Sequence, residues 1–303
     1  MAGVFPGSAA ARAIPRSGCC WSRDAERKWR EMIRAAVTIS LVEEARKGPF
    51  VFHGDLEAGC QQAAELGFDA IELFAASGEM IRGLPLRQLL QRYGLQLAAV
   101  GTGAGMVVRK LQLCDADAAR RAAAAEFIQG IMEAGAEFGA PAIIGSMQGR
   151  WDDVVPRDVA TGYLQSALER LGQRAGELGT FLLYEPLNRY ETNMCNTMAQ
   201  GAELLRPLAT RSVKLLADLF HMNIEETSLV AGLRDAGEFL GHIHFVDSTR
   251  QAAGRGHMVY EPLVEVLREL QYSGYLSAEV FPLPDSRTAA EQTIRTFRRL
   301  YPV

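Results

Sequence analysis

Short apolar runs alternate with longer amphipathic stretches along most of the chain. A run of about four to eight apolar residues between turn-forming residues is typical of a buried strand, whereas apolar positions repeating every three to four residues are typical of a helix. The pattern predicts strands centred on residues 37–40, 70–73, 96–100, 142–145, 181–184, 214–217, 242–246 and 276–280. It predicts helices at residues 56–67, 86–93, 117–138, 159–178, 197–208, 228–239, 261–271 and 286–300.

The order of these elements predicts the fold class. Strands that alternate with helices form a parallel sheet, and eight such units in about 270 residues favour closure into a barrel over an open sheet. Local signals support the boundaries: Asp115 or Asp117 can cap the helix at 117–138, while Gly67 and Gly94 separate a helix from the next strand. We therefore expect an α/β protein with a (β/α)8 TIM barrel, formed by one catalytic domain at residues 32–303.

The first thirty-one residues differ from the rest of the chain. Residues 1–23 are rich in Ala, Gly, Ser and Arg, contain no acidic residue, and lack the continuous apolar core of a secretion signal. Met32 directly precedes the first predicted strand and can be the true start. We expect residues 1–31 to be a leader that is disordered or absent from the native protein. The alternative is a short exposed helix at residues 24–33.

Composition argues against several classes of protein. The formal net charge is −4 and no long basic block occurs, which argues against nucleic acid as a partner. The five cysteines include no C-x-x-C pair, so neither a disulfide framework nor a zinc knuckle is indicated, and a cytoplasmic location is expected. No apolar stretch reaches the roughly 18 to 20 residues that span a bilayer, so no membrane partner is expected.

Four polar residues lie at the ends of the last four predicted strands: Glu185, Asp218, His244 and Glu279. In (β/α)8 barrels the chemistry lies at the carboxyl ends of the strands. Three carboxylates and one imidazole suit a hard divalent cation, for which Mn²⁺ is favoured and Mg²⁺ or Co²⁺ are alternatives. This spacing predicts one metal site at the mouth of the barrel.

Each of these residues also has a structural interpretation. A single carboxylate after a strand is commonly a helix cap or part of a salt bridge, and the case for a metal site depends on four occurring in consecutive units. His242 and His244 share one face of their strand because strand side chains alternate. His244 is nearer the mouth, so we expect His242 to be a hydrogen-bonded histidine one layer deeper.

Several longer motifs carry a resemblance to a known family. They are Glu185-Pro-Leu-Asn-Arg-Tyr-Glu191, Ala217-Asp-Leu-Phe-His221, Gly241-His-Ile-His244, Asp247-Ser-Thr-Arg250 and Ser277-Ala-Glu279. Together they resemble the ketose 3-epimerases, which include the D-tagatose and D-psicose 3-epimerases and belong to the xylose-isomerase-like sugar isomerase and epimerase barrels. The loop at residues 246–250 and the segment at 52–56 are more similar to the 5-keto-L-gluconate epimerase branch. A substrate that carries a carboxylate therefore stays open.

The resemblance implies roles for individual residues. It implies that Glu185, Asp218, His244 and Glu279 bind one divalent ion. Glu185 and Glu279 would also be the acid/base pair of a C3 epimerisation through an enediolate. The resemblance further implies that Glu191, His221 and Arg250 hold the sugar, and that relatives form homodimers or homotetramers. Asn188 and Arg189 are expected to support these groups.

Two further loops contain candidate substrate contacts. The glycine run at residues 101–105 has the wrong spacing for a dinucleotide-binding motif, and we expect a flexible loop over the sugar instead. The loop at residues 145–151 follows the fourth predicted strand, and Trp151 is a candidate wall of the pocket.

Three other functions stay open. An aldose-ketose isomerase on the same barrel would use similar ligands and move a proton between C1 and C2. A DNA-repair enzyme of the endonuclease IV type would need a histidine-rich zinc cluster, which five histidines do not favour. A non-catalytic or partner-dependent sugar-binding protein could keep the metal ligands without performing the reaction.

Overall fold

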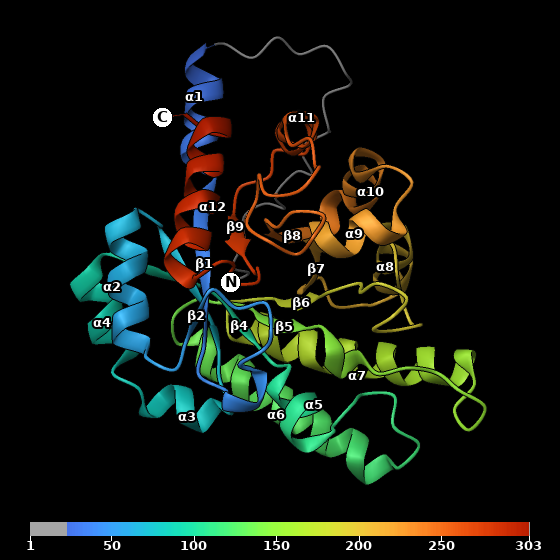
Figure 1. Ribbon diagram of the computed structural model, residues 1–303. Helices are drawn as coiled ribbons and strands as arrows, with labels where there is room; N and C mark the ends of the chain where they lie inside the picture. The colour runs from blue at the N-terminus through green and yellow to red at the C-terminus, as the bar shows by residue number, and fades with distance from the viewer. Residues whose placement is uncertain (1–22, 303) are drawn as a thin grey trace, which may run out of the picture.

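The computed structural model describes residues 23–302 and confirms the predicted barrel (Figure 1). In the described part of the chain the sheet has nine strands, all in parallel pairs, and eight of them close the barrel because β9 pairs with β1. These eight are β1 (Arg34–Ser40), β3 (Ala70–Phe74), β4 (Gln96–Gly101), β5 (Ala142–Ile144), β6 (Leu182–Tyr184), β7 (Val213–Asp218), β8 (Leu240–His244) and β9 (Tyr275–Ala278). The short strand β2 (Phe52–His53) pairs with the end of β1.

Helices surround the barrel. They are α1 (Arg23–Glu31), α2 (Leu56–Leu66), α3 (Gly78–Gly83), α4 (Leu86–Tyr93), α5 (Ala104–Arg109), α6 (Ala118–Ala136), α7 (Arg157–Glu177), α8 (Met198–Leu205), α9 (Leu219–Glu225), α10 (Leu229–Ala236), α11 (Glu261–Glu269) and α12 (Ser286–Leu300). Three 3-10 turns accompany them: η1 (Glu43–Ala45), η2 (Ser146–Gln148) and η3 (Gly237–Phe239). The predicted caps are present, since Asp117 accepts a hydrogen bond from Ala119 at the start of α6, and Gly67 and Gly94 end α2 and α4 with positive φ.

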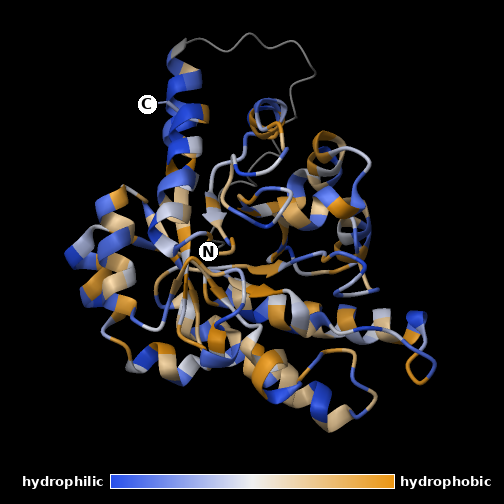
Figure 2. Ribbon diagram, in the orientation of Figure 1, coloured by the Kyte–Doolittle hydropathy of each residue, from blue (hydrophilic) through white to orange (hydrophobic). Residues whose placement is uncertain are grey.

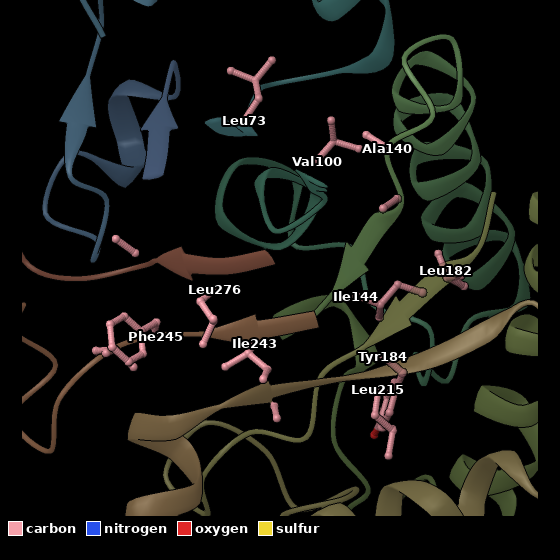
Figure 3. Packing of buried hydrophobic residues seen from close by; sticks show 14 of the residues in the cluster. Leu73, Val100, Ala140, Ile144, Leu182, Tyr184, Leu215, Ile243, Phe245 and Leu276 are labelled. Carbon is pink, nitrogen blue, oxygen red and sulfur yellow. The ribbon is translucent and has the colours of Figure 1, made fainter. Parts of the chain in front are cut away.

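Alternate residues of each strand face opposite sides of the barrel wall. One set, which includes Leu182, Ile243 and Leu276, belongs to the main hydrophobic core shared with the helices (Figure 3). The other set faces the barrel interior, where Leu183 and Leu216 form a separate small apolar cluster with Ala99 and Ile143. In Figure 2 the central strands are mostly coloured as hydrophobic, whereas helix α12 carries many hydrophilic positions. At the ends of the strands, the residues that face the barrel interior belong to the candidate site.

The glycine run at residues 101–105 is not the flexible loop that we expected. Gly101 ends strand β4, and helix α5 begins at Ala104. A Cβ atom on Gly101 would lie 2.7 Å from Cδ2 of Phe74, and one on Gly103 would lie 3.0 Å from Cε2 of the same ring. The absence of side chains at these two positions therefore makes room for Phe74. Helices α3 and α9 and strand β2 were also not expected from the pattern, because each is shorter than the window over which a period can be recognised.

The described part of the predicted leader forms helix α1. Trp29 on this helix is 1% exposed, and its indole Nε1 donates a hydrogen bond of 2.9 Å to the carbonyl oxygen of Tyr272. The Arg30 guanidinium donates to the carbonyl oxygen of Leu300 at the end of α12, so the first and last helices lie side by side (Figure 1). A helix therefore lies where the alternative expectation put it, although its tryptophan is buried. Residues 1–22 lie outside the described residues, and the division at residue 32 stays a prediction.

Within residues 23–302, no helix is both long enough and apolar enough to cross a bilayer.

Candidate active site

The four predicted metal ligands lie at the ends of four consecutive strands. Asp218 and His244 are the last residues of β7 and β8, while Glu185 and Glu279 directly follow β6 and β9. In each case a buried apolar strand ends in a polar residue on the interior face, as the alternation requires. Because all barrel strands are parallel, their carboxyl ends meet at one mouth.

The side chains converge on one atom of His244. Nδ1 of His244 lies 3.1 Å from Oδ2 of Asp218, 3.5 Å from Oε1 of Glu185 and 3.6 Å from Oε2 of Glu279. One potential ligand atom from each of the four residues lies within 4.8 Å of the other three. The second oxygen of Asp218 accepts hydrogen bonds from the backbone N–H groups of Phe220 and His221, which fixes the orientation of the carboxylate.

Three groups of this cluster have pKa values that differ from their ordinary values. Burial raises the pKa of Glu279 to about 7, and the nearby carboxylates of Glu185 and Asp218 add to the rise. Burial acts in the same direction on Asp218, but the neighbouring His221 and His244 hold its pKa below the usual range. Burial alone would lower the pKa of His244, yet Glu72 and Glu279 raise it well above its ordinary value. Carboxylates held this close to one another favour a bound cation.

The donor set fits a divalent ion. It consists of three carboxylates and one imidazole, and all four side chains are largely withdrawn from solvent. Buried carboxylates are costly unless they are paired or coordinate a metal. Oxygen-rich sets of this kind suit Mn²⁺, Mg²⁺ or Co²⁺, whereas closed structural zinc sites are rich in thiolates.

Arg250 links the cluster to Glu191. Its guanidinium donates from Nη2 to Oε2 of Glu279 at 3.1 Å and from Nη1 to Oε1 of Glu191 at 3.2 Å. The backbone of Arg250 has a positive φ of 56°, and it is held by a hydrogen bond from its N–H to the carbonyl oxygen of Asp247. This turn directs the arginine into the mouth, where its guanidinium also lies 5.0 Å from the ring centroid of Phe220.

His221 presents one free ring nitrogen. The backbone N–H of Asn188 donates to Nδ1 of His221 at 3.2 Å, so the proton of the neutral imidazole lies on Nε2. Within the described structure this Nε2 atom is buried and has no hydrogen-bond partner, and His221 lines the mouth cavity. The side-chain amide of Asn188 also donates to Glu191, so Asn188 supports two of the predicted substrate contacts.

A cavity of about 340 Å³ opens at the mouth. It is lined on one side by Glu185, Glu191, His221, Arg250 and Glu279. The opposite side contains residues of the first strands and loops, among them Phe50, Phe74, Gly101, Ile143 and Ser146. The cavity therefore has a charged wall and a mostly uncharged wall.

One buried charged residue was missed from the sequence. Glu72 lies in strand β3 and is 4% exposed, and its carboxylate contacts both His242 and His244. Glu72 is therefore the partner in the hydrogen bond that was expected for His242. The signal was present in the run Ala70-Ile-Glu-Leu-Phe74, where a charge interrupts an apolar strand.

Two other expected residues do not contact the cavity. Trp151 is 36% exposed and its indole donates to the backbone carbonyl of Asn193, so the expectation of a pocket wall is wrong. Arg189 pairs with Glu225 on helix α9 at 2.9 Å. Both interactions brace the loop between β6 and α8 on its outer side.

Comparisons with known proteins agree with the fold. A model of the xylose isomerase-like TIM barrel family matches residues 60–300, and the chain belongs to this family. The D-psicose 3-epimerase of Agrobacterium fabrum is 32% identical over 247 residues, which cover 78% of this chain and 80% of that enzyme. The 3-dehydro-D-guloside 4-epimerase of Escherichia coli is 35% identical over 135 residues, or 45% of this chain and 49% of that enzyme.

Solved structures extend the similarity of fold. A crystal structure of a D-psicose 3-epimerase in the presence of D-fructose superposes with a TM-score of 0.72 at 22% identity, covering 88% of this chain and 99% of that one. The predicted resemblance to the ketose 3-epimerases is confirmed, as is an enzyme of the sugar epimerase and isomerase class.

Proposed function

We propose that this protein epimerises a ketose at C3 with the help of one divalent cation, using Glu185 and Glu279 as the acid/base pair. One observation carries the proposal. Glu185 and Glu279 come from strands β6 and β9, which are not neighbours in the barrel, yet both line the same cavity. Two carboxylates that reach one substrate from separate strands can act on opposite faces of a carbon atom.

The two glutamates and the ion together provide the groups that this reaction requires. The hydrogen on C3 of a ketose is acidic because the carbonyl at C2 stabilises the resulting enediolate. One glutamate removes this proton, and the other returns a proton to the opposite face of C3. The proposed ion would be held by Glu185, Asp218, His244 and Glu279. When bound it supplies Lewis acidity toward the substrate oxygens, and Mn²⁺ is preferred over Mg²⁺ or Co²⁺.

Three residues are proposed to bind and orient the sugar. His221 offers its Nε2–H group to a substrate oxygen, because its other ring nitrogen already accepts from Asn188. Arg250 pairs with Glu191 and Glu279, and its buried Nε–H group, which has no partner in the described structure, can donate to a substrate oxygen. Glu191 can in turn accept a hydrogen bond from a sugar hydroxyl.

The charge of the cavity favours a neutral ketose over a sugar acid. In the described structure its charged lining residues are Arg250 and five glutamates, namely Glu44, Glu72, Glu185, Glu191 and Glu279. Arg250 already pairs with two of these glutamates, so the described lining leaves no side-chain cation for a substrate carboxylate, and the remaining glutamates would repel it. We therefore propose a free ketose as substrate, in place of the keto-acid that the segments at 52–56 and 246–250 left open.

The proposal is tested by NMR of the Mg²⁺-loaded protein in D₂O with fructose, psicose, tagatose, ribulose and 5-ketogluconate. Deuterium entering the carbinol carbon next to the carbonyl, which is C3 of the four ketoses and C4 of 5-ketogluconate, together with formation of its epimer supports the proposal and ranks the substrates. Deuterium at C1 with an aldose product would make the protein an aldose-ketose isomerase. Absence of exchange in all five sugars, with the ion bound, would overturn catalysis on free ketoses and favour a binding role.

The same NMR measurement distinguishes C3 epimerisation from a second reaction, which is epimerisation at C4. The 35% identical segment shared with a 3-dehydro-D-guloside 4-epimerase makes a 3-keto glycoside a relevant additional substrate. Exchange at C4 of such a compound that is faster than exchange at C3 of every ketose would replace the proposed C3 chemistry.

Assembly and location stay predictions. We propose a homodimer or homotetramer, which light scattering after size exclusion would test. The cytoplasmic location is tested by cell fractionation.

A further inference from the structure

A buried carboxylate lies on the far side of His244 from the proposed ion. Oε1 of Glu72 lies 3.2 Å from Nε2 of His244, whereas Nδ1 of the same ring faces Asp218, Glu185 and Glu279. Strand β3, which carries Glu72, is separated from β8 by β1 and β9 in the closed sheet. The contact therefore crosses the interior of the barrel and connects residues 172 positions apart in the chain.

This contact places one hydrogen of the His244 ring on Nε2. An ionised carboxylate can only accept hydrogen bonds, so the hydrogen between Glu72 and His244 belongs to Nε2 of the imidazole. Asp218 faces Nδ1 at 3.1 Å in the same way, so the ring can carry a hydrogen on both nitrogens while no ion is bound. A neutral imidazole carries one N–H group, and when Glu72 holds that hydrogen on Nε2 the Nδ1 atom keeps a lone pair for the ion. That lone pair points toward the cluster of carboxylates, which is the form of histidine that can bind a metal.

A second histidine holds the carboxylate of Glu72 in place. Nε2 of His242 lies 2.9 Å from Oε2 of Glu72, so each carboxylate oxygen has one imidazole partner. His242, His244 and Glu72 are each at most 4% exposed. Glu72 consequently has little freedom to rotate away from His244.

We propose that Glu72 is a positioning residue, which sets the tautomer and the ring orientation of His244 so that its Nδ1 atom can bind the ion. The inference rests on the metal role proposed for His244. Partners of this kind behind a ligand histidine typically contribute about 10- to 100-fold to metal affinity.

The test uses Glu72→Gln, which preserves the size of the side chain but gives it an amide donor. The amide can donate to Nε2 of His244, which would move the ring proton to Nδ1 and remove the lone pair from the site. Glu133→Gln is the matched control, because Glu133 is a partly buried, salt-bridged glutamate on the outer helix α6.

The first readout does not depend on activity. Two-bond ¹H–¹⁵N NMR of the Mg²⁺-loaded protein, labelled at histidine, resolves the tautomer of each ring, and the chain has only five histidines. With a His244→Asn variant for assignment, we expect the proton of His244 on Nε2 alone in the wild type and in the control, and on Nδ1 in Glu72→Gln. A wild-type His244 that keeps a proton on Nδ1 with Mg²⁺ bound would overturn the proposal.

The second readout is calorimetric titration with Mn²⁺. We expect one ion per chain in every variant, with a Kd about 10- to 100-fold higher in Glu72→Gln than in the wild type or the control. Equal affinity in Glu72→Gln would overturn the inference alone. Two ions in the wild type and one in Glu72→Gln would show that Glu72 is itself a ligand. A wild type that binds no Mn²⁺ would overturn the proposed metal function.

Discussion

The two halves of the barrel mouth end their strands differently. The last four strands end at or next to charged or ionisable residues, namely Glu185, Asp218, His244 and Glu279. The first four end at or next to uncharged residues, namely Ser40, Phe74, Gly101 and Gly145. Glu185 and Glu279 from the last strands line the same cavity as Phe74, Gly101 and Gly145 from the first strands.

The difference teaches how one repeated architecture concentrates the chemistry on one side of the mouth. Every strand of the parallel barrel delivers its last interior residue to the same mouth. The type of that residue then decides its role: carboxylates and imidazole concentrate charge on one wall, while Phe74 and the glycines that make room for it form the other. Substitutions of the proposed metal ligands should alter kcat and metal affinity, whereas substitutions of Phe74 or Gly101 should alter KM.

The largest effect is expected for Glu279→Gln. The variant cannot exchange a proton with C3, so kcat should fall by about 10²- to 10⁴-fold. Stopped-time assays of epimer formation measure the rate, and metal analysis of the same sample verifies that the ion is bound. Near-normal kcat in a metal-loaded variant would contradict the role of Glu279.

Asp218→Asn should act mainly on the ion. The amide oxygen can still cap helix α9, as the carboxylate does for Phe220 and His221, but the negative charge is lost. We expect the Kd for Mn²⁺ to rise at least about tenfold and the increase in Tm on adding Mn²⁺ to shrink, because a ligand stabilises the folded state according to its affinity. Calorimetry and thermal melts with and without Mn²⁺ measure both. An unchanged increase in Tm would exclude Asp218 as a ligand.

Gly145→Ala tests a contact between the two walls. A Cβ atom at this position would lie 2.5 Å from Oε2 of Glu185, at the mobile end of that side chain. The carboxylate should shift with little change in stability, and a shift of about 1 Å can reduce kcat by up to about 100-fold.

The matched control is Gly101→Ala, whose Cβ would instead approach Cδ2 of Phe74 at 2.7 Å. It should raise KM more than it lowers kcat. Identical kinetic effects of the two alanines would contradict the separation of the walls.

The smallest effect is expected for Phe74→Leu. The leucine keeps an apolar side chain at this position, whose exposure is 9%, but removes the ring that packs 4.6 Å from the centroid of Phe50. We expect KM to rise about three- to tenfold, equivalent to roughly 1 kcal/mol of binding free energy, with kcat and Mn²⁺ affinity preserved. Initial-rate kinetics at saturating Mn²⁺ measure this. A loss of metal affinity would mean that the aromatic wall also shapes the charged one.

Much of this site could be anticipated because its residues lie at recognisable places along the chain. Glu185 and Asp218 each end a short apolar run, so their position at a strand end is a local property of the sequence. Trp151 was misassigned because a loop residue after a strand can turn toward the mouth or away from it. Its hydrogen bonds to Asn193 turn it away.

The sequence by itself determined the alternation of strands and helices, the ends of the last strands and the family resemblance. These features depend on neighbouring residues and on the period of burial, which are visible along the chain. Only the tertiary structure decided that Arg250 joins Glu191 to Glu279 and that Glu72 lies behind His244. Such contacts join residues 29 to 172 positions apart, and they form only when the folded sheet brings the ends of its strands together.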